Sequence, residues 1–182
     1  MGVDMTFYKD MDLCDYHEGA YSAENWDCPL LTIGWIEFQH GFSVGEVSDD
    51  LLAKLKVLTK EFGEAFPGLQ FRGLHACSIC ENATDVDTPP DRYVRVPFLD
   101  GKLFVLSGAT LDDSCINLFL PGKNVVFIAP GRIDHYIEVH SYRPPEEFLL
   151  AVKNCESPLS RAYAESIRAV NFGNKPPLYE TD

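Results

Sequence analysis

The chain is poor in positive charge and has no long apolar segment. Its 182 residues include 15 Lys and Arg against 28 Asp and Glu, which gives a formal net charge of −13. Phosphate binding depends on clustered Lys and Arg, so we expect no nucleic-acid partner and, as a protein partner, a neutral or basic one. No apolar run approaches the roughly 20 residues that span a bilayer, and the acidic N-terminus has no apolar signal region. These absences predict a cytoplasmic protein that does not bind membranes.

Signatures of disulfide-rich proteins and of several enzyme classes are also missing. Six cysteines spread over the chain are too few for a disulfide scaffold. Four of them have no close partner in sequence and are expected to be ordinary thiols: Cys14, Cys28, Cys115 and Cys155. The chain has no His-Glu-x-x-His motif, no glycine-rich phosphate loop and no zinc-deaminase signature. No activity of those three classes is therefore indicated.

The apolar pattern predicts one α+β domain over residues 1–182. Residues 1–28 show no periodicity and are expected to be irregular, and residues 171–182 are expected to form a loose tail. "LLTIGWIEF", residues 30–38, is rich in β-branched and aromatic types and predicts a buried strand. After a possible N-cap at Ser48, "DDLLAKLKVLTKEF" predicts a helix whose apolar face contains Leu51, Leu55, Leu58 and Phe62.

The second half of the chain predicts a sheet followed by helices. Four β-rich segments are separated by turn sequences and predict an antiparallel meander: "RYVRVPFL", "KLFVLSGA", "CINLFL" and "NVVFIAP". Two or three helices are expected after it, in "GRIDHYIEVHSY", "PPEEFLLAVKNC" and "LSRAYAESIRAV". In the second of these segments, Phe148 and Val152 are expected on one apolar side. In the last helix, Ser157 and Pro158 are the expected N-cap and first residue. Its expected apolar face contains Leu159, Tyr163, Ile167 and Val170.

Two short segments carry the residues that typically bind zinc. "RGLHACSIC" places Cys77 and Cys80 in a Cys-x-x-Cys pair, whose spacing lets two thiolates reach one ion from a tight turn. "HYIEVH" supplies His135 and His140, with four residues between them. We expect these four residues to form a tetrahedral zinc site that joins the sheet to the closing helix. His75 is an alternative ligand, or a second-layer residue that hydrogen-bonds to one.

The geometry of a helix constrains this prediction. Residues five apart in a straight helix point about 140° away from each other. His135 and His140 can therefore bind one ion only if the helix ends near His140, as Pro144 and Pro145 suggest. A redox role for the Cys pair and a chance pairing are the alternatives. The redox role is disfavoured because "ENATDVDTPP" after Cys80 is a poor helix former, whereas thioredoxin-like pairs begin a helix.

Three segments together resemble a family of small, functionally uncharacterised bacterial proteins. The segments are "GWIEFQHGFSVG", "RGLHACSIC" and "HYIEVHSYRPPEEFLLAV". The resemblance implies that ten residues occupy recurrent positions of the family: Trp35, His40, His75, Cys77, Cys80, His135, His140, Tyr142, Pro144 and Pro145. It implies no activity. The chain departs from the family in a longer segment after Cys80 and in an additional C-terminal helix.

Three functions are compatible with these residues. The first is a binding or adaptor domain with a structural zinc ion. The second is an acidic immunity- or antitoxin-like inhibitor of a basic partner protein. The third is a zinc-dependent hydrolase, for which Glu81, Asp134 and Glu138 are the candidate bases because each is close in sequence to a proposed ligand. A possible anion site at Arg132 and the isolated His17 and His40 are weaker candidates. We expect the structural role, because five candidate ligands favour a saturated site.

Overall fold

The computed structural model describes residues 7–15, 19–69, 77–82, 93–95, 103–105 and 116–179. Its main sheet has the strand order β1 (Leu30–Thr32), β5 (Val126–Pro130), β4 (Asn117–Pro121). β4 and β5 form the antiparallel hairpin that the Pro-Gly turn predicts, whereas β1 pairs with β5 in parallel. The parallel pair brings two segments far apart in sequence into the same core.

The prediction of one antiparallel meander is wrong. β2 (Tyr93–Arg95) and β3 (Leu103–Val105) do pair antiparallel, but they form a two-stranded sheet separate from β1, β5 and β4. The α+β class itself is confirmed. Turn sequences specify neighbouring strands of a hairpin, because such contacts are local. They do not specify how one hairpin packs against another, which depends on the whole core.

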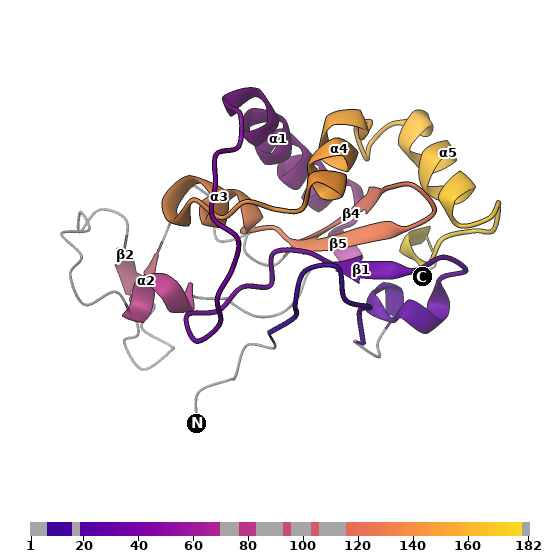
Figure 1. Cartoon of the computed structure of the whole chain (residues 1–182). Helices are drawn as coiled ribbons and strands as arrows, with labels where there is room; N and C mark the ends of the chain where they lie inside the picture. Colours follow the sequence, from indigo (N-terminus) through magenta and orange to yellow (C-terminus); the bar gives the residue numbers. More distant parts are fainter. Residues whose placement is uncertain are drawn as a thin grey trace.

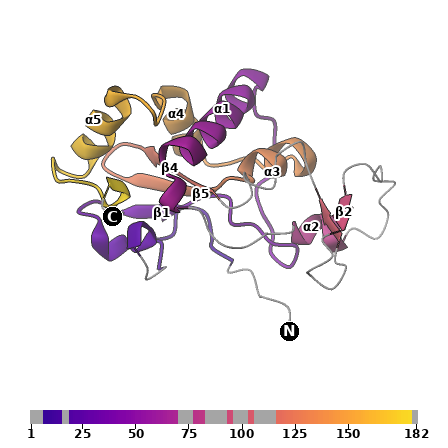
Figure 2. The same cartoon turned by 180° about the vertical axis from the view of Figure 1, so that it is seen from behind.

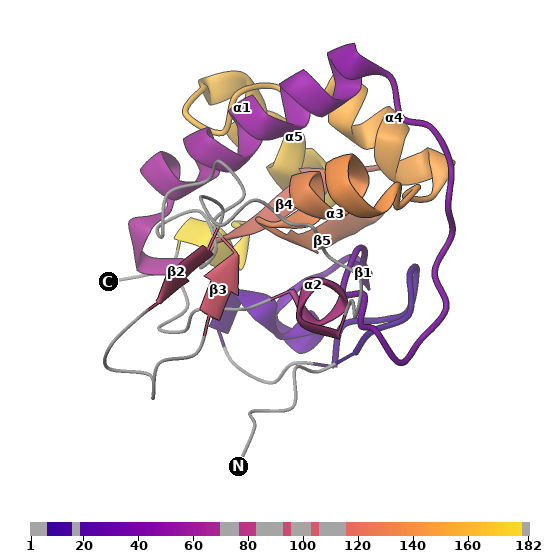
Figure 3. The same ribbon diagram turned by 90° about the vertical axis from the view of Figure 1, so that its left-hand side faces the viewer.

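Helices cover one face of the main sheet (Figure 1). α1 (Asp49–Ala65), α4 (Glu146–Asn154) and α5 (Arg161–Val170) all contact β4, and Figure 3 shows them on the same side of it. The short 3-10 turns Gly19–Tyr21 and Ala23–Asn25 lie on the opposite side, as the view from behind shows (Figure 2). None of the described helices is long and apolar enough to cross a membrane.

The predicted apolar faces of α1 and α4 are confirmed. In α1, Leu55, Leu58 and Phe62 are buried, whereas Leu51 is only half-buried. Ser48 stands at the N-cap position of α1, although its side chain makes no capping hydrogen bond. The buried residues of α4 include Phe148 and Val152.

The start of α5 differs from the prediction. The helix begins at Arg161, and the N-cap is Ser160, whose Oγ accepts a hydrogen bond from the Tyr163 amide at 3.1 Å. Leu159 therefore lies before the helix and is 55% exposed, outside the apolar face to which it was assigned. Ser157 and Ser160 both offer capping oxygens. The later one is used because it places Tyr163 and Ile167 in the core.

Both ends of the described chain are held against the main body. The amides of Met11 and Cys14 donate to the carbonyls of Thr32 and Leu30, each at 2.9 Å, so this N-terminal segment follows the edge of β1 that β5 does not use. At the other end, Leu178 is 1% exposed within the 3-10 turn Pro177–Tyr179. Residues 176–178 of the expected loose tail are thus buried, whereas residues 172–175 are exposed.

Gly34 lies where four segments of the chain meet. Its φ is +77°, a conformation that favours glycine, and a Cβ atom there would lie 2.9 Å from Ile133 Cδ1. Its amide donates to Asp10 Oδ1 at 2.8 Å. The Tyr142 hydroxyl donates to the same carboxylate, at 2.9 Å from Oδ1 and 2.8 Å from Oδ2. The Gly-Trp segment therefore needs glycine for both conformation and space.

Replacing Gly34 should destabilise the fold. We expect Gly34→Ala to lower the free energy of unfolding by about 2 kcal/mol, because it adds backbone strain and a clash with Ile133. Urea denaturation measures this. Gly41→Ala is the matched control, since nothing lies within 4 Å of its Cβ position and its φ is ordinary. Equal effects of the two substitutions would contradict the role of Gly34.

Candidate metal centre

The four predicted ligands come together between two helices. Cys77 immediately precedes α2 (Ser78–Asn82), and Cys80 lies within it. His135 and His140 both belong to α3 (Ile133–His140). Figures 1 and 3 show α2 beside α3 although they are distant in sequence. One side-chain ligand atom from each of the four residues lies within 4.8 Å of the other three, so the group can hold a metal ion.

The distances within this cluster suit a tetrahedral ion. His140 Nε2 lies 3.2 Å from the Sγ atoms of both Cys77 and Cys80, and His135 Nε2 lies 3.5 Å from Cys80 Sγ. Zinc bonds of about 2.0–2.3 Å in a regular tetrahedron give ligand-to-ligand distances of roughly 3.3–3.8 Å. Two sulfur and two imidazole ligands are also a set that zinc commonly takes. The residues present therefore fit the ion in chemistry, and these three distances lie close to tetrahedral spacing.

The end of α3 resolves the angular problem of the two histidines. The helix ends at His140, and Ser141 adopts a left-handed conformation with φ of 53°. The Tyr142 amide then donates back to the Tyr136 carbonyl at 3.0 Å. The imidazole centroids of His135 and His140 lie 5.1 Å apart with an angle of 83° between the ring planes. The predicted helix end near His140 is confirmed, and it is what lets both rings face the thiols.

Hydrogen bonds from the neighbouring side chains favour a thiolate at Cys77. Its side chain is fully buried, whereas Cys80 and His140 are half-buried. A hydrogen bond from Cys80, with further bonds from His135 and His140, lowers the pKa of the Cys77 thiol far below its usual value, against the opposing effect of burial. His135 Nδ1 is buried and has no hydrogen-bond partner among the described residues. Its Nε2 faces the cluster, so an ion held there would bind Nε2 and leave the ring proton on Nδ1.

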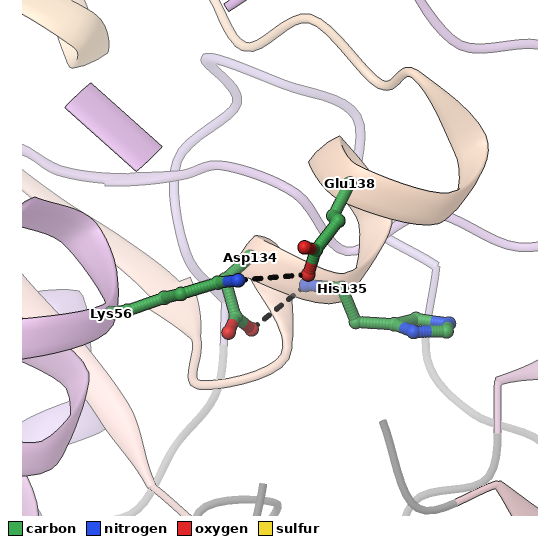
Figure 4. A network of polar contacts seen from close by, with 4 residues as sticks. All are labelled: Lys56, Asp134, His135 and Glu138. Carbon is green, nitrogen blue, oxygen red and sulfur yellow. Dashed lines mark hydrogen bonds and ion pairs between the residues drawn. The ribbon is translucent and has the colours of Figure 1, made fainter. Parts of the chain in front are cut away.

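Two of the three candidate bases face away from the cluster. Figure 4 shows Asp134 and Glu138 pointing towards α1, opposite to the His135 imidazole. Glu138 is bound by Lys56 Nζ at 2.9 Å, and Asp134 Oδ1 accepts the His135 amide at 2.8 Å. Burial raises the pKa of Asp134, and the nearby Lys56 opposes this effect. The side chain of the third candidate, Glu81, lies outside the described part of the structure.

The comparisons with known proteins identify a family. A family model described as a domain of unknown function, DUF7919, matches residues 6–153. The chain belongs to the DUF7919 family. No curated protein and no solved structure matches the chain. Membership of an uncharacterised family is thus confirmed, while the ten recurrent positions and the bacterial origin stay predictions.

The range matched to DUF7919 contains the whole cluster but not the C-terminal helix. Cys77, Cys80, His135 and His140 all fall within it, together with the N-terminal segment that pairs with β1. The matched range ends at residue 153, within α4, so α5 lies beyond it. The cluster is thus part of the DUF7919 domain itself.

Of the other histidines of this DUF7919 chain, His40 lies among the described residues and is not part of the cluster. His40 is exposed and stacks on Phe7, with ring centroids 3.8 Å apart. His17 and His75 lie outside the described residues, so the role predicted for His75 stays a prediction. Arg132 at the start of α3 is 9% exposed, and the first-turn amide of His135 is already taken by Asp134. This arrangement does not favour the anion site that the sequence suggested at Arg132.

The Cys pair begins a helix, contrary to the prediction. α2 covers Ser78–Asn82 directly after Cys77, so the local argument against a redox pair is wrong for these residues. Two imidazoles within 3.5 Å of the thiols still favour a metal over a disulfide exchange site. The choice between a metal site and a redox pair therefore depends on the histidines of α3, not on the sequence after Cys80.

Sequence reading missed three features near the cluster. Residues 41–45 spell GFSVG, the Gly-x-Ser-x-Gly pattern of a nucleophile elbow, but that motif needs a strand-turn-helix context. Here Ser43 is exposed, and its carbonyl accepts the Arg143 amide at 2.9 Å within an extended segment. Ser78 Oγ accepts the Phe38 amide at 3.0 Å, and Asp10 binds Tyr142. No local pattern marks Ser78 or Asp10, since both act over long sequence separations.

Thiol reactivity should distinguish the cluster from the other cysteines. In metal-free protein near neutral pH, iodoacetamide should modify Cys80 readily, because it is half-exposed beside hydrogen-bonding partners. Cys155 should stay unmodified, because burial raises the pKa of its thiol to about 12. Added Zn²⁺ should protect Cys80. Peptide mapping by mass spectrometry measures modification at each site. Equal modification of both cysteines would contradict the predicted difference in reactivity between Cys80 and Cys155.

Proposed function

We propose that this chain is a zinc-binding domain in which one structural Zn²⁺ is held by Cys77, Cys80, His135 and His140. The observation that supports it is the approach of two thiols and two imidazoles to within 4.8 Å of one another. A set of two sulfur and two nitrogen ligands favours zinc over the harder ions Mg²⁺ and Ca²⁺, which prefer oxygen ligands.

The arrangement of the ligands supports a structural role for the ion. They come in two pairs, and the hydrogen-bonded Cys-His contacts join residues 55 to 63 positions apart. An ion at this position would tie α2 to α3 and thereby cross-link the chain on both sides of the β2–β3 hairpin. Four protein ligands would also saturate zinc's preferred tetrahedron and leave no position for an activated water. Asp134 and Glu138 face α1, which further disfavours the hydrolase.

For the cellular role we propose a binding or adaptor domain for a neutral or basic protein. The net charge of −13 supports a partner of this kind. An immunity- or antitoxin-like inhibitor of a basic protein is the narrower version of the same proposal, because it too acts by occupying a partner's surface.

Metal content and stability test the central claim together. Protein purified from zinc-replete cells without a metal-chelating tag should contain one zinc per chain by plasma emission. Cys77→Ser should lower Tm by about 10 °C or more, because the free energy of zinc binding adds to the stability of the folded state. Each kcal/mol of stability changes Tm by roughly 2–4 °C in a domain of this size.

Cys14→Ser is the matched control for this experiment. Cys14 is also buried, and its thiol donates to the Tyr21 carbonyl at 3.2 Å, a bond that serine can replace. This variant should keep its zinc and change Tm little. Zinc-free wild-type protein, or equal small shifts for both variants, would contradict the proposed site.

Coordination number separates the structural site from the hydrolase. Co²⁺-substituted protein should give the absorption spectrum of a four-coordinate site with two thiolates, and X-ray absorption should find two sulfur and two nitrogen neighbours. An oxygen neighbour from bound water would favour the hydrolase instead. Asp134→Asn should leave the spectrum unchanged, because this carboxyl group faces away from the cluster.

A further inference from the structure

The position of His140 depends on how the chain leaves α3. Ser141 reverses the chain, and the segment after it pairs with residues 43–45: the Gly45 amide donates to the Ser141 carbonyl and the Arg143 amide to the Ser43 carbonyl, each at 2.9 Å. Tyr142 stands between these two bonds and its side chain is fully buried. Whatever fixes Tyr142 thus fixes the turn that directs His140 towards the thiols.

A carboxylate from the N-terminal segment fixes the Tyr142 side chain. Both oxygens of Asp10 accept the Tyr142 hydroxyl, at 2.8 and 2.9 Å, and Oδ1 also accepts the Gly34 amide at 2.8 Å. Bonds between a carboxylate and neutral donors are stronger than bonds between neutral groups.

Asp10 belongs to a segment that is itself docked on the sheet. On one side of it, the Tyr8 amide donates to the Trp35 carbonyl at 3.4 Å. On the other side, Met11 and Cys14 donate to β1, and the Thr32 amide donates to the Asp12 carbonyl at 2.9 Å. The Asp10–Tyr142 contact therefore connects the edge of the sheet with the end of α3, across 132 residues.

We propose that Asp10 and Tyr142 are positioning residues that couple metal binding through His140 to the docking of residues 8–14 on β1. This inference rests on the proposed metal site. An ion that holds His140 in place favours the turn at Ser141 and hence the position of the Tyr142 hydroxyl. Coupling of this kind is reciprocal, so the docked segment strengthens metal binding by the same factor by which the metal strengthens docking.

The first arm of the test measures zinc affinity by competition with a chelator. Tyr142→Phe and Asp10→Ala should each weaken binding by about 10- to 100-fold, the usual effect of residues that orient a metal ligand. The double variant should bind about as weakly as either single variant, because both remove the same contact. Asp10→Ala changes a half-buried residue near the N-terminus and tests the same contact should Tyr142→Phe fail to fold.

Tyr163→Phe is the matched control. Tyr163 is also fully buried, and its hydroxyl donates to the Phe119 carbonyl at 2.8 Å, between α5 and β4. The substitution removes the same atom and one buried hydrogen bond, but it lies on elements that carry no proposed ligand. It should lower stability while leaving zinc affinity within about twofold of wild type.

The second arm measures hydrogen exchange in the zinc-bound proteins. In Tyr142→Phe and Asp10→Ala, the amides of Met11 and Cys14 should exchange at least about tenfold faster than in wild type or Tyr163→Phe. The Val126 amide, which donates to the Pro29 carbonyl at 2.9 Å, serves as the reference for global unfolding and should be unaffected. Faster exchange restricted to residues 8–14 would show that this segment detaches from β1 without global unfolding.

The outcomes separate this inference from the metal site on which it rests. Wild-type protein that binds no zinc would overturn both. Wild-type protein that binds zinc, with Tyr142→Phe and Asp10→Ala keeping wild-type affinity, would overturn the coupling alone. The coupling would also be overturned if Tyr163→Phe weakened zinc binding as much as Tyr142→Phe, since loss of stability would then explain both.

Discussion

Two histidines five residues apart can serve one ion only at the end of a helix, and this constraint organises the region around the cluster. An uninterrupted helix would direct His135 and His140 about 140° apart. α3 instead ends at His140, and the chain turns back through Ser141 into a short pairing with residues 43–45. The Gly-Trp segment, the N-terminal segment and the closing segment all contribute contacts to that turn.

Buried polar contacts carry this arrangement, and each has a partner that stabilises it. The Asp10 carboxylate receives hydrogen bonds from a hydroxyl and a backbone amide, so its removal from bulk water is offset. The positive φ of Gly34 lets its amide reach that carboxylate while Ile133 packs against the glycine. A side chain at position 34 would disturb the carboxylate contact and the start of α3 together.

The cluster adds a second connection between parts of the chain that also meet in the apolar core. The main sheet has three short strands, and helices cover one of its faces. α2 has five residues, too few for a stable helix without tertiary contacts. The described contacts of α2 with the body include the Ser78–Phe38 hydrogen bond and the Cys-His approaches to α3. An ion at the cluster would therefore add a cross-link to the packing of Cys77 and Ile79 with the core.

The sequence by itself determined the features that depend on residues a few positions apart. The helical faces of α1 and α4, the β4–β5 hairpin and the ligand types and spacings of the cluster all followed from local patterns. Only the tertiary structure decided that β1 joins β5 in parallel, that Asp134 and Glu138 face α1, and that Asp10 meets Tyr142. Local periodicity specifies which side of an element is apolar. Which distant element covers that side depends on packing the whole core, and no short stretch of sequence contains that information.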